Sequence, residues 1–182
     1  MIKRTAGASA RFRARVAGAF YLMTFATGVT ALMVRGTVGI AAGAVAAACY
    51  VAVTMLFYPL FKPVNGPVSL LAACVSLAGI VAGPVRLTGV NPLVFFGFYC
   101  LLIGYLILRS TFLPRILGAL MVFAGLGWLT FLSPALARAL SPYNFAPGLI
   151  GEGVLTVWLL AVGVNAQRWT EQAGVAAAQQ RL

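Results

Sequence analysis

Long apolar runs separated by short polar stretches dominate the chain from residue 16 to residue 166. The hydrocarbon core of a bilayer is about 30 Å thick, and a helix needs about twenty residues to cross it. Only helices and closed barrels satisfy their own backbone hydrogen bonds in lipid, and these runs are too continuous for barrel strands. The pattern predicts an all-α membrane protein with six transmembrane helices, at residues 16–34, 38–61, 67–85, 92–108, 114–133 and 146–166.

Residues typical of helix starts stand before several of these runs. Asn65 and Asn91 each come shortly before a proline, and Ser141 precedes the last run. The connections are short, so consecutive helices are expected to pack side by side in one antiparallel bundle. The segment 133–141 contains two Ser-Pro pairs and is interpreted as a brief interfacial helix on the outer face.

Small residues recur four positions apart in the second and third predicted helices. Gly39 and Gly43 lie in one, and Gly79 and Gly83 in the other. Such spacing lets helix backbones approach closely in lipid. It predicts that these two helices pack against each other.

The predicted organisation is a basic tail at 1–15, the bundle at 16–168 and a short tail at 169–182. The apolar run that follows the basic residues is long and lacks a small-x-small cleavage site, so a retained first helix is favoured over a cleaved signal peptide.

Basic residues are distributed unequally between the two sides of the predicted bundle. The chain has 13 Lys and Arg against two acids, with 62% hydrophobic residues and a mean hydropathy of +1.01. Three basic residues, Arg35, Arg86 and Arg138, fall on one side, and the other ten fall on the side that holds both termini. By the positive-inside rule both termini are cytoplasmic, in a bacterial cytoplasmic (inner) membrane. The basic tail fits attraction to anionic membrane lipid, and no motif for nucleic acid accompanies it.

The inventory of side chains excludes several kinds of chemistry. The chain has no His, and its only acids are Glu152 and Glu171. Metal sites built from imidazole and carboxylate, His-ligated haem and Ser-His-Asp catalysis are therefore disfavoured, and no cofactor or metal is predicted. The cysteines Cys49, Cys74 and Cys100 lie within apolar runs and are interpreted as small core residues.

Glu152 is the only acid inside a predicted span. An ionised carboxylate there costs roughly 2 to 3 kcal/mol or more, so its presence needs a reason. A rise of about 1.5 Å per residue puts it roughly 10 Å below the outer surface. Residues at similar or slightly greater depth, together with a basic residue of the outer rim, form the predicted ligand-binding set: Glu152, Tyr99, Thr27, Ser76, Trp128 and Arg86.

Two interpretations of Glu152 remain open. In one, the carboxyl is protonated or hydrogen-bonded to Tyr99 or another hydroxyl and only holds helices together. In the other, it is a proton donor or ligand anchor, with Arg86 or Arg138 reaching down as counter-ion. The glycines at 148, 151 and 153 strip bulk from around the acid and leave room for a neighbouring helix, a water or a ligand head group.

Four segments resemble a known family. They are residues 15–29, 56–73, 104–120 and 148–165, and their most specific pieces are the turn Arg109–Arg115 and the pair Gly151-Glu152. They are similar to bacterial multi-pass membrane proteins catalogued as domain of unknown function 4386, in the same order from Arg15 to Arg168. The resemblance implies a helical bundle in the cytoplasmic membrane and no established activity. The chain departs from the family in its short Arg35-Gly36-Thr37 turn and in having Ser76 where some relatives carry a basic residue.

Three classes of function fit these observations. The first is a small bundle that binds a lipid-soluble ligand or a partner subunit, which needs no catalytic group. The second is a proton-coupled small-molecule transporter that uses Glu152. The third is a metal-free intramembrane enzyme on a lipid or isoprenoid, with Glu152 as general acid and Tyr99 or Trp128 stabilising positive charge. The expected partners are membrane lipid, a lipid-soluble small molecule, and a protein partner or second copy of the chain.

Overall fold

The computed structural model describes residues 2–85 and 91–179, with the side chains of residues 7–82 and 91–179. Across these residues the chain is helical and contains no strand, which confirms the all-α prediction. The two shortest elements are the 3-10 turns η1 (Thr130–Leu132) and η2 (Tyr143–Phe145). The helices are α1 (Ile2–Met33), α2 (Thr37–Phe61), α3 (Gly66–Val85), α4 (Leu93–Arg109), α5 (Arg115–Leu129), α6 (Pro134–Leu140), α7 (Ala146–Ala161) and α8 (Ala166–Gln179).

Four stretches are long and apolar enough to cross a membrane: Gly7–Met33, Thr37–Phe61, Arg115–Leu132 and Tyr143–Ala161. The apolar stretches Gly66–Ala82 in α3 and Leu93–Arg109 in α4 are shorter. Length and composition thus support a membrane protein with at least these four candidate spans. The full set of six, and the side on which the termini lie, stay predictions.

Side-chain caps confirm two of the predicted helix starts, those at Asn65 and Asn91, whereas Ser141 does not cap the last span: α7 begins after Phe145 with no side-chain cap. The Oδ1 atom of Asn65 accepts from the backbone N–H of Val68 at 3.1 Å, and that of Asn91 accepts from Leu93 at 3.0 Å. Ser133 caps α6, the short helix predicted within 133–141. These caps begin α3, α4 and α6 because each supplies an acceptor for an N–H that lacks a helical partner.

The predicted last span, 146–166, is too long in the structure. Helix α7 ends at Ala161, and Gly163 has φ +74°, a left-handed backbone that favours glycine. The N–H groups of Val162 and Gly163 both bond to the carbonyl of Trp158, which closes the helix end. The chain then turns into α8, which carries Trp169.

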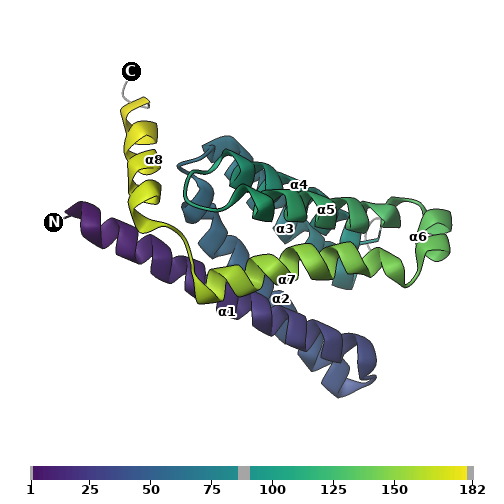
Figure 1. Ribbon diagram of the computed structural model, residues 1–182. Coiled ribbons are helices and arrows are strands. Elements are labelled where there is room, and N and C mark those ends of the chain that lie inside the picture. Colours follow the sequence, from purple (N-terminus) through teal and green to yellow (C-terminus); the bar gives the residue numbers. More distant parts are fainter. Residues whose placement is uncertain (1, 86–90, 180–182) are drawn as a thin grey trace.

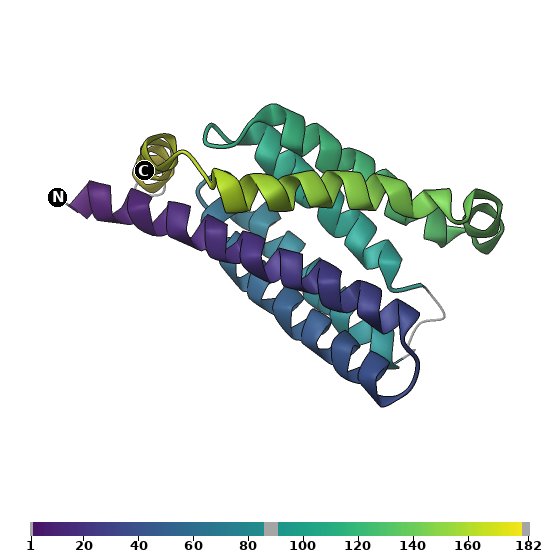
Figure 2. The same cartoon turned by 60° about the horizontal axis from the view of Figure 1, so that its bottom comes forward.

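The helices form antiparallel pairs, with α7 packed between α1 and α5 (Figures 1 and 2). The start of α1 and helix α8 lie at one end of the molecule, and α6 lies at the other (Figure 1). Residues 2–15, assigned to the basic tail, are helical and continue into α1. Gly7 in this part of α1 lies against Ala166 and Thr170 of α8.

Glycines also allow a close backbone contact between α4 and α5. A Cβ on Gly104 would lie 2.9 Å from the carbonyl oxygen of Gly118, and a Cβ on Gly118 would lie 2.9 Å from that of Gly104. Gly97 and Gly125 repeat this reciprocal contact toward the other end of the pair. The two backbones therefore touch at two levels.

The prediction that the glycines of α2 and α3 bring these two helices together is wrong, because Gly43 and Gly79 contact other helices. Gly43 of α2 faces Ala31 of α1, and Gly39 lies against the backbone of Val34 in the α1–α2 turn. Gly79 of α3 faces Phe95 of α4. The small residues pack each helix against its other neighbour in the chain, because the spacing marks a close face and does not say which helix meets it.

Candidate functional site

Glu152 is the centre of a hydrogen-bonded junction of three helices. Its side chain is buried on α7, with 5% of its surface exposed. The hydroxyl of Tyr21 on α1 donates to Oε2 at 2.6 Å, and the indole Nε1 of Trp128 on α5 donates to Oε1 at 2.6 Å. Both carboxyl oxygens therefore accept a short hydrogen bond from a different helix, which satisfies a polar group that would otherwise be costly to bury.

Two glycines of α7 make this junction sterically feasible. The ring of Trp128 lies directly over Gly148, where any side chain would collide with it. Gly151 lies against the main chain of Leu120 and the methyl group of Ala124 on α5. The space that these glycines were predicted to leave is thus filled by the Trp128 ring and by α5. Only Gly153 has open space around it.

A chain of buried tyrosines extends from the junction into the bundle. The rings of Tyr21 and Tyr50 meet edge to face with centroids 5.6 Å apart, and those of Tyr50 and Tyr99 are 5.7 Å apart. The hydroxyl groups of Tyr50 and Tyr99 are buried and have no hydrogen-bond partner among the described residues. Tyr99 therefore lies two rings beyond Tyr21 and makes no hydrogen bond to Glu152.

Among the described residues, the others predicted to surround Glu152 do not form hydrogen bonds with it. The Thr27 hydroxyl donates to the carbonyl of Met23 at 2.6 Å on α1. Ser76 pairs with Thr54 at 2.7 Å between α3 and α2. Arg138 is exposed on α6 and lines a surface cavity with Asn91, so it is not the counter-ion of Glu152. Arg86 lies outside the described residues.

Trp128 and Glu152, the donor on α5 and the acid on α7, both come from the part of the chain that runs from α4 to α7. Residues 87–163 match the family model described as Domain of unknown function (DUF4386). The resemblance drawn from the Arg109–Arg115 turn and the Gly151-Glu152 pair is confirmed over this range, which is less than half of the chain. No curated protein and no solved structure matches the chain.

The DUF4386 match divides the junction. Trp128 and Glu152 lie inside it, as do Tyr99 and the glycines of the α4–α5 contact, whereas Tyr21 and Tyr50 lie outside. The resemblance noted at residues 15–29 and 56–73 is not covered by the match and stays a prediction. The matched segment contains Glu152 and its donor Trp128, whereas the other donor, Tyr21, comes from the part of the chain before the match.

Tyr21 is the functional residue that sequence reasoning missed. Its position could have been found from the stripe Ala10, Ala14 and Ala17, which are all buried on one face of α1. Tyr21 continues this stripe four residues further on, so it must face the same neighbours. Counting depth selected Thr27, which lies six residues, or about 9 Å, further along α1 and on another side of the helix.

The four cavities described among these residues lie away from the junction. Of the four cavities described around residues of known placement, none has Glu152 in its lining. The carboxyl group is therefore a joint between helices in this conformation, and a ligand would reach it only by replacing one of its two donors.

Proposed function

We propose that the chain is a six-span protein of the bacterial cytoplasmic membrane with both termini inside. Large apolar side chains point outward, such as Met33 at 81% and Ile40 at 76% exposed, whereas polar side chains such as Ser76 and Glu152 are buried. This distribution is expected when the surrounding solvent is lipid.

The ends of α4 support six spans. Asn91, just before α4, lines a cavity with Arg138 and Ser141, beside α6. At the other end, the carbonyl of Arg109 accepts from Gln172 of α8 at 3.4 Å. Helix α4 thus runs from the α6 end to the α8 end, as α5 does in the opposite direction, and it extends over the same height despite its shorter apolar stretch.

Within this bundle, we propose that Glu152 binds a lipid-soluble ligand that carries a hydrogen-bond donor. The observation that carries this proposal is the exposure of its two donors. Tyr21 is 1% exposed, whereas Trp128 is only partly buried and lies at the edge of the bundle beside Phe131 and Phe145. A hydroxyl or amide head group arriving from the lipid would replace the Trp128 N–H and bond to Oε1 of Glu152.

The test measures the ligand that copurifies with the protein, by native mass spectrometry in detergent. Glu152→Gln is expected to lose the ligand because an amide turns part of the acceptor into a donor. Trp128→Phe keeps a ring of similar shape over Gly148 and removes the competing N–H, so it is expected to retain more ligand than the native chain. Glu171→Gln, which changes the only other acid, is the matched control and is expected to behave as the native chain does.

A purely structural Glu152 gives a different pattern. Both Glu152→Gln and Trp128→Phe would then lower the unfolding temperature, and neither would change ligand content. That result would overturn the proposed ligand site.

The buried hydroxyls of Tyr50 and Tyr99 favour one alternative, proton-coupled transport. They extend from Tyr21 into the bundle and could pass a proton to or from Glu152. The same Glu152→Gln variant separates the two functions in sealed liposomes. Loss of a proton flux that the native chain supports would identify the transporter, and the absence of any native flux would leave the ligand-binding function.

A further inference from the structure

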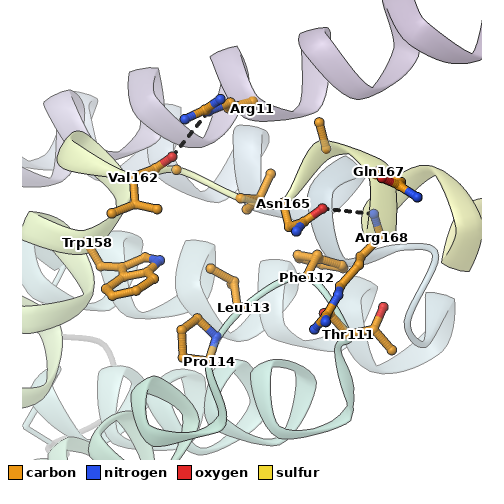
Figure 3. Close-up of a pocket in the computed structure, with 13 residues that line it drawn as sticks. Arg11, Thr111, Phe112, Leu113, Pro114, Trp158, Val162, Asn165, Gln167 and Arg168 are labelled. Atoms are coloured by element: carbon orange, nitrogen blue, oxygen red, sulfur yellow. Dashed lines mark hydrogen bonds between the residues drawn. The ribbon is translucent and has the colours of Figure 1, made fainter.

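A second site lies at the opposite end of α7 from Glu152. Here α1, the turn between α4 and α5, the end of α7 and the start of α8 surround an open cavity of about 530 Å³. Figure 3 shows the residues around it: Arg11 on one side, Arg168 on another, and Leu113, Pro114 and Trp158 along the remaining wall. The cavity therefore combines two cationic side chains from different helices with an apolar wall.

The arginines at this end are placed by the chain itself. The Nε atom of Arg11 donates to the carbonyl of Val162 at 3.3 Å, and Arg15 donates to Ala161 at 3.1 Å, where α7 presents its last carbonyl groups. Gly163 allows this approach, since a Cβ there would lie 3.2 Å from Cγ of Arg11. Arg11 is thus held beside the cavity by the helix end that it caps.

Helix α8 is fixed over the cavity by contacts with the turn between α4 and α5 and with the end of α2. Asn165 caps its first turn by accepting from the backbone N–H of Arg168 at 3.1 Å, and its own N–H bonds to Phe112 at 3.1 Å. Trp169 donates to the carbonyl of Leu60 at 2.9 Å, and Gln172 accepts from Thr111 at 3.0 Å. Arg168 therefore projects from an anchored helix.

Among the described residues, no side-chain carboxylate lines the cavity beside the two arginines. Neither acid of the chain is among the lining residues. Glu152 accepts from Tyr21 and Trp128, and Glu171 accepts from Gln167 at 3.0 Å. Two guanidinium groups beside a helix N-terminus favour an anion, and a planar guanidinium suits the oxygens of a phosphate group.

The cavity continues into an apolar groove. Trp158 and Val162 line both the cationic cavity and a second hollow along the outward face of α7, which also includes Val154 and Val157. Gly153 also lines this groove, and a side chain there would meet nothing within 4 Å. A molecule with its anionic group between the arginines could therefore lay an apolar tail along α7.

We propose that this continuous surface binds one anionic phospholipid. Its phosphate lies between Arg11 and Arg168, and one acyl chain follows the groove past Trp158 to Gly153. The predicted orientation puts the cavity at the cytoplasmic face, where anionic lipids attract basic groups. This site is separate from Glu152 in position and in ligand, so either can fail without the other.

The test is a titration of delipidated protein in non-ionic detergent with phosphatidylglycerol, phosphatidylcholine or inorganic phosphate, scored by native mass spectrometry. Phosphatidylglycerol is expected to bind in preference to phosphatidylcholine. Arg11→Gln and Arg168→Gln are each expected to weaken this binding by roughly tenfold, the size of one lost charge-assisted hydrogen bond. Arg13→Gln, the same charge change two residues from Arg11 and outside the cavity lining, is the control and is expected to bind as the native chain does.

The groove is tested by Gly153→Leu, which fills open space and leaves the arginines unchanged. It is expected to weaken phosphatidylglycerol binding, and inorganic phosphate is not expected to displace the lipid. Free phosphate as the true ligand would show itself by competing effectively while Gly153→Leu has no effect. Equal losses in Arg13→Gln and Arg168→Gln would indicate diffuse surface charge and would also overturn the proposal. If Arg11→Gln does not fold, Arg168→Gln and Gly153→Leu decide the question.

Discussion

Single residues determine whether a carboxyl group can exist inside this bundle. Glu152 is tolerated because Tyr21 and Trp128 each donate to one of its oxygens at 2.6 Å. The two donors differ in whether a molecule from outside the bundle could replace them. Tyr21 is almost completely buried, so nothing from outside can take its place, whereas Trp128 lies at the bundle edge.

Tyr21→Phe removes the inner donor and keeps the ring. We expect a loss of about 1–3 kcal/mol in the free energy of unfolding, because a buried acceptor loses its partner. Detergent unfolding titrations measure this difference. Tyr143→Phe is the control, since Tyr143 is 79% exposed and the same hydroxyl deletion should leave stability unchanged. Equal stability of Tyr21→Phe and the native chain would show that the junction does not hold α1 to α7.

At the scale of helices, glycine contacts decide which pairs pack most closely. Gly104→Ala would place a methyl group 2.8 Å from Val122 and 2.9 Å from the Gly118 carbonyl, so α4 and α5 must move apart. We expect a destabilisation of about 1–3 kcal/mol, as for other overpacked contacts. Gly28→Ala is the control, because Gly28 also lies within a helix but has nothing within 4 Å. Thermal unfolding of both variants in one detergent compares them directly.

Such a control also distinguishes packing from helix propensity. Replacing glycine by alanine within a helix is favourable by about 1 kcal/mol when no neighbour interferes. Gly28→Ala should therefore equal or exceed the native chain in stability. A similar gain in Gly104→Ala would contradict the close α4–α5 contact.

Local sequence signals predicted where helices begin better than they predicted which helices pack together. Asn65, Asn91 and Ser133 are caps whose function depends only on the next few residues, so the starts of α3, α4 and α6 could be recognised. The end of α7 could not, because Gly163 is one of 20 glycines and its left-handed conformation depends on the turn into α8.

The candidate site shows the same limit. Its acid was evident as the only one within an apolar run, and depth selected Trp128 correctly. Depth along a helix does not give rotation about its axis, so Thr27 and Ser76 were predicted at a junction that they do not reach. Tyr21 follows from the stripe of small residues on α1, a signal of rotation about the helix axis that depth does not contain.

For the whole molecule, the undecided question is whether the shorter helices α3 and α4 cross the membrane. A re-entrant α3–α4 hairpin would return to the cytoplasmic side, and the positions of Lys62 and Arg109 would be the same in both arrangements. Only the connection between α3 and α4 distinguishes them. Asn91 is exposed in this region and lies beside α6, on the side predicted to be external.

Cysteine labelling at Asn91 therefore tests the six-span arrangement. In a chain with Cys49, Cys74 and Cys100 replaced by alanine, Asn91→Cys is expected to react with a membrane-impermeant maleimide in intact cells. Arg35→Cys, in the α1–α2 turn, should react in the same way, and Lys62→Cys should react only after permeabilisation. Protection of Asn91→Cys while Arg35→Cys reacts would mean that α3 and α4 enter and leave on one side, which leaves the four long spans to cross the bilayer.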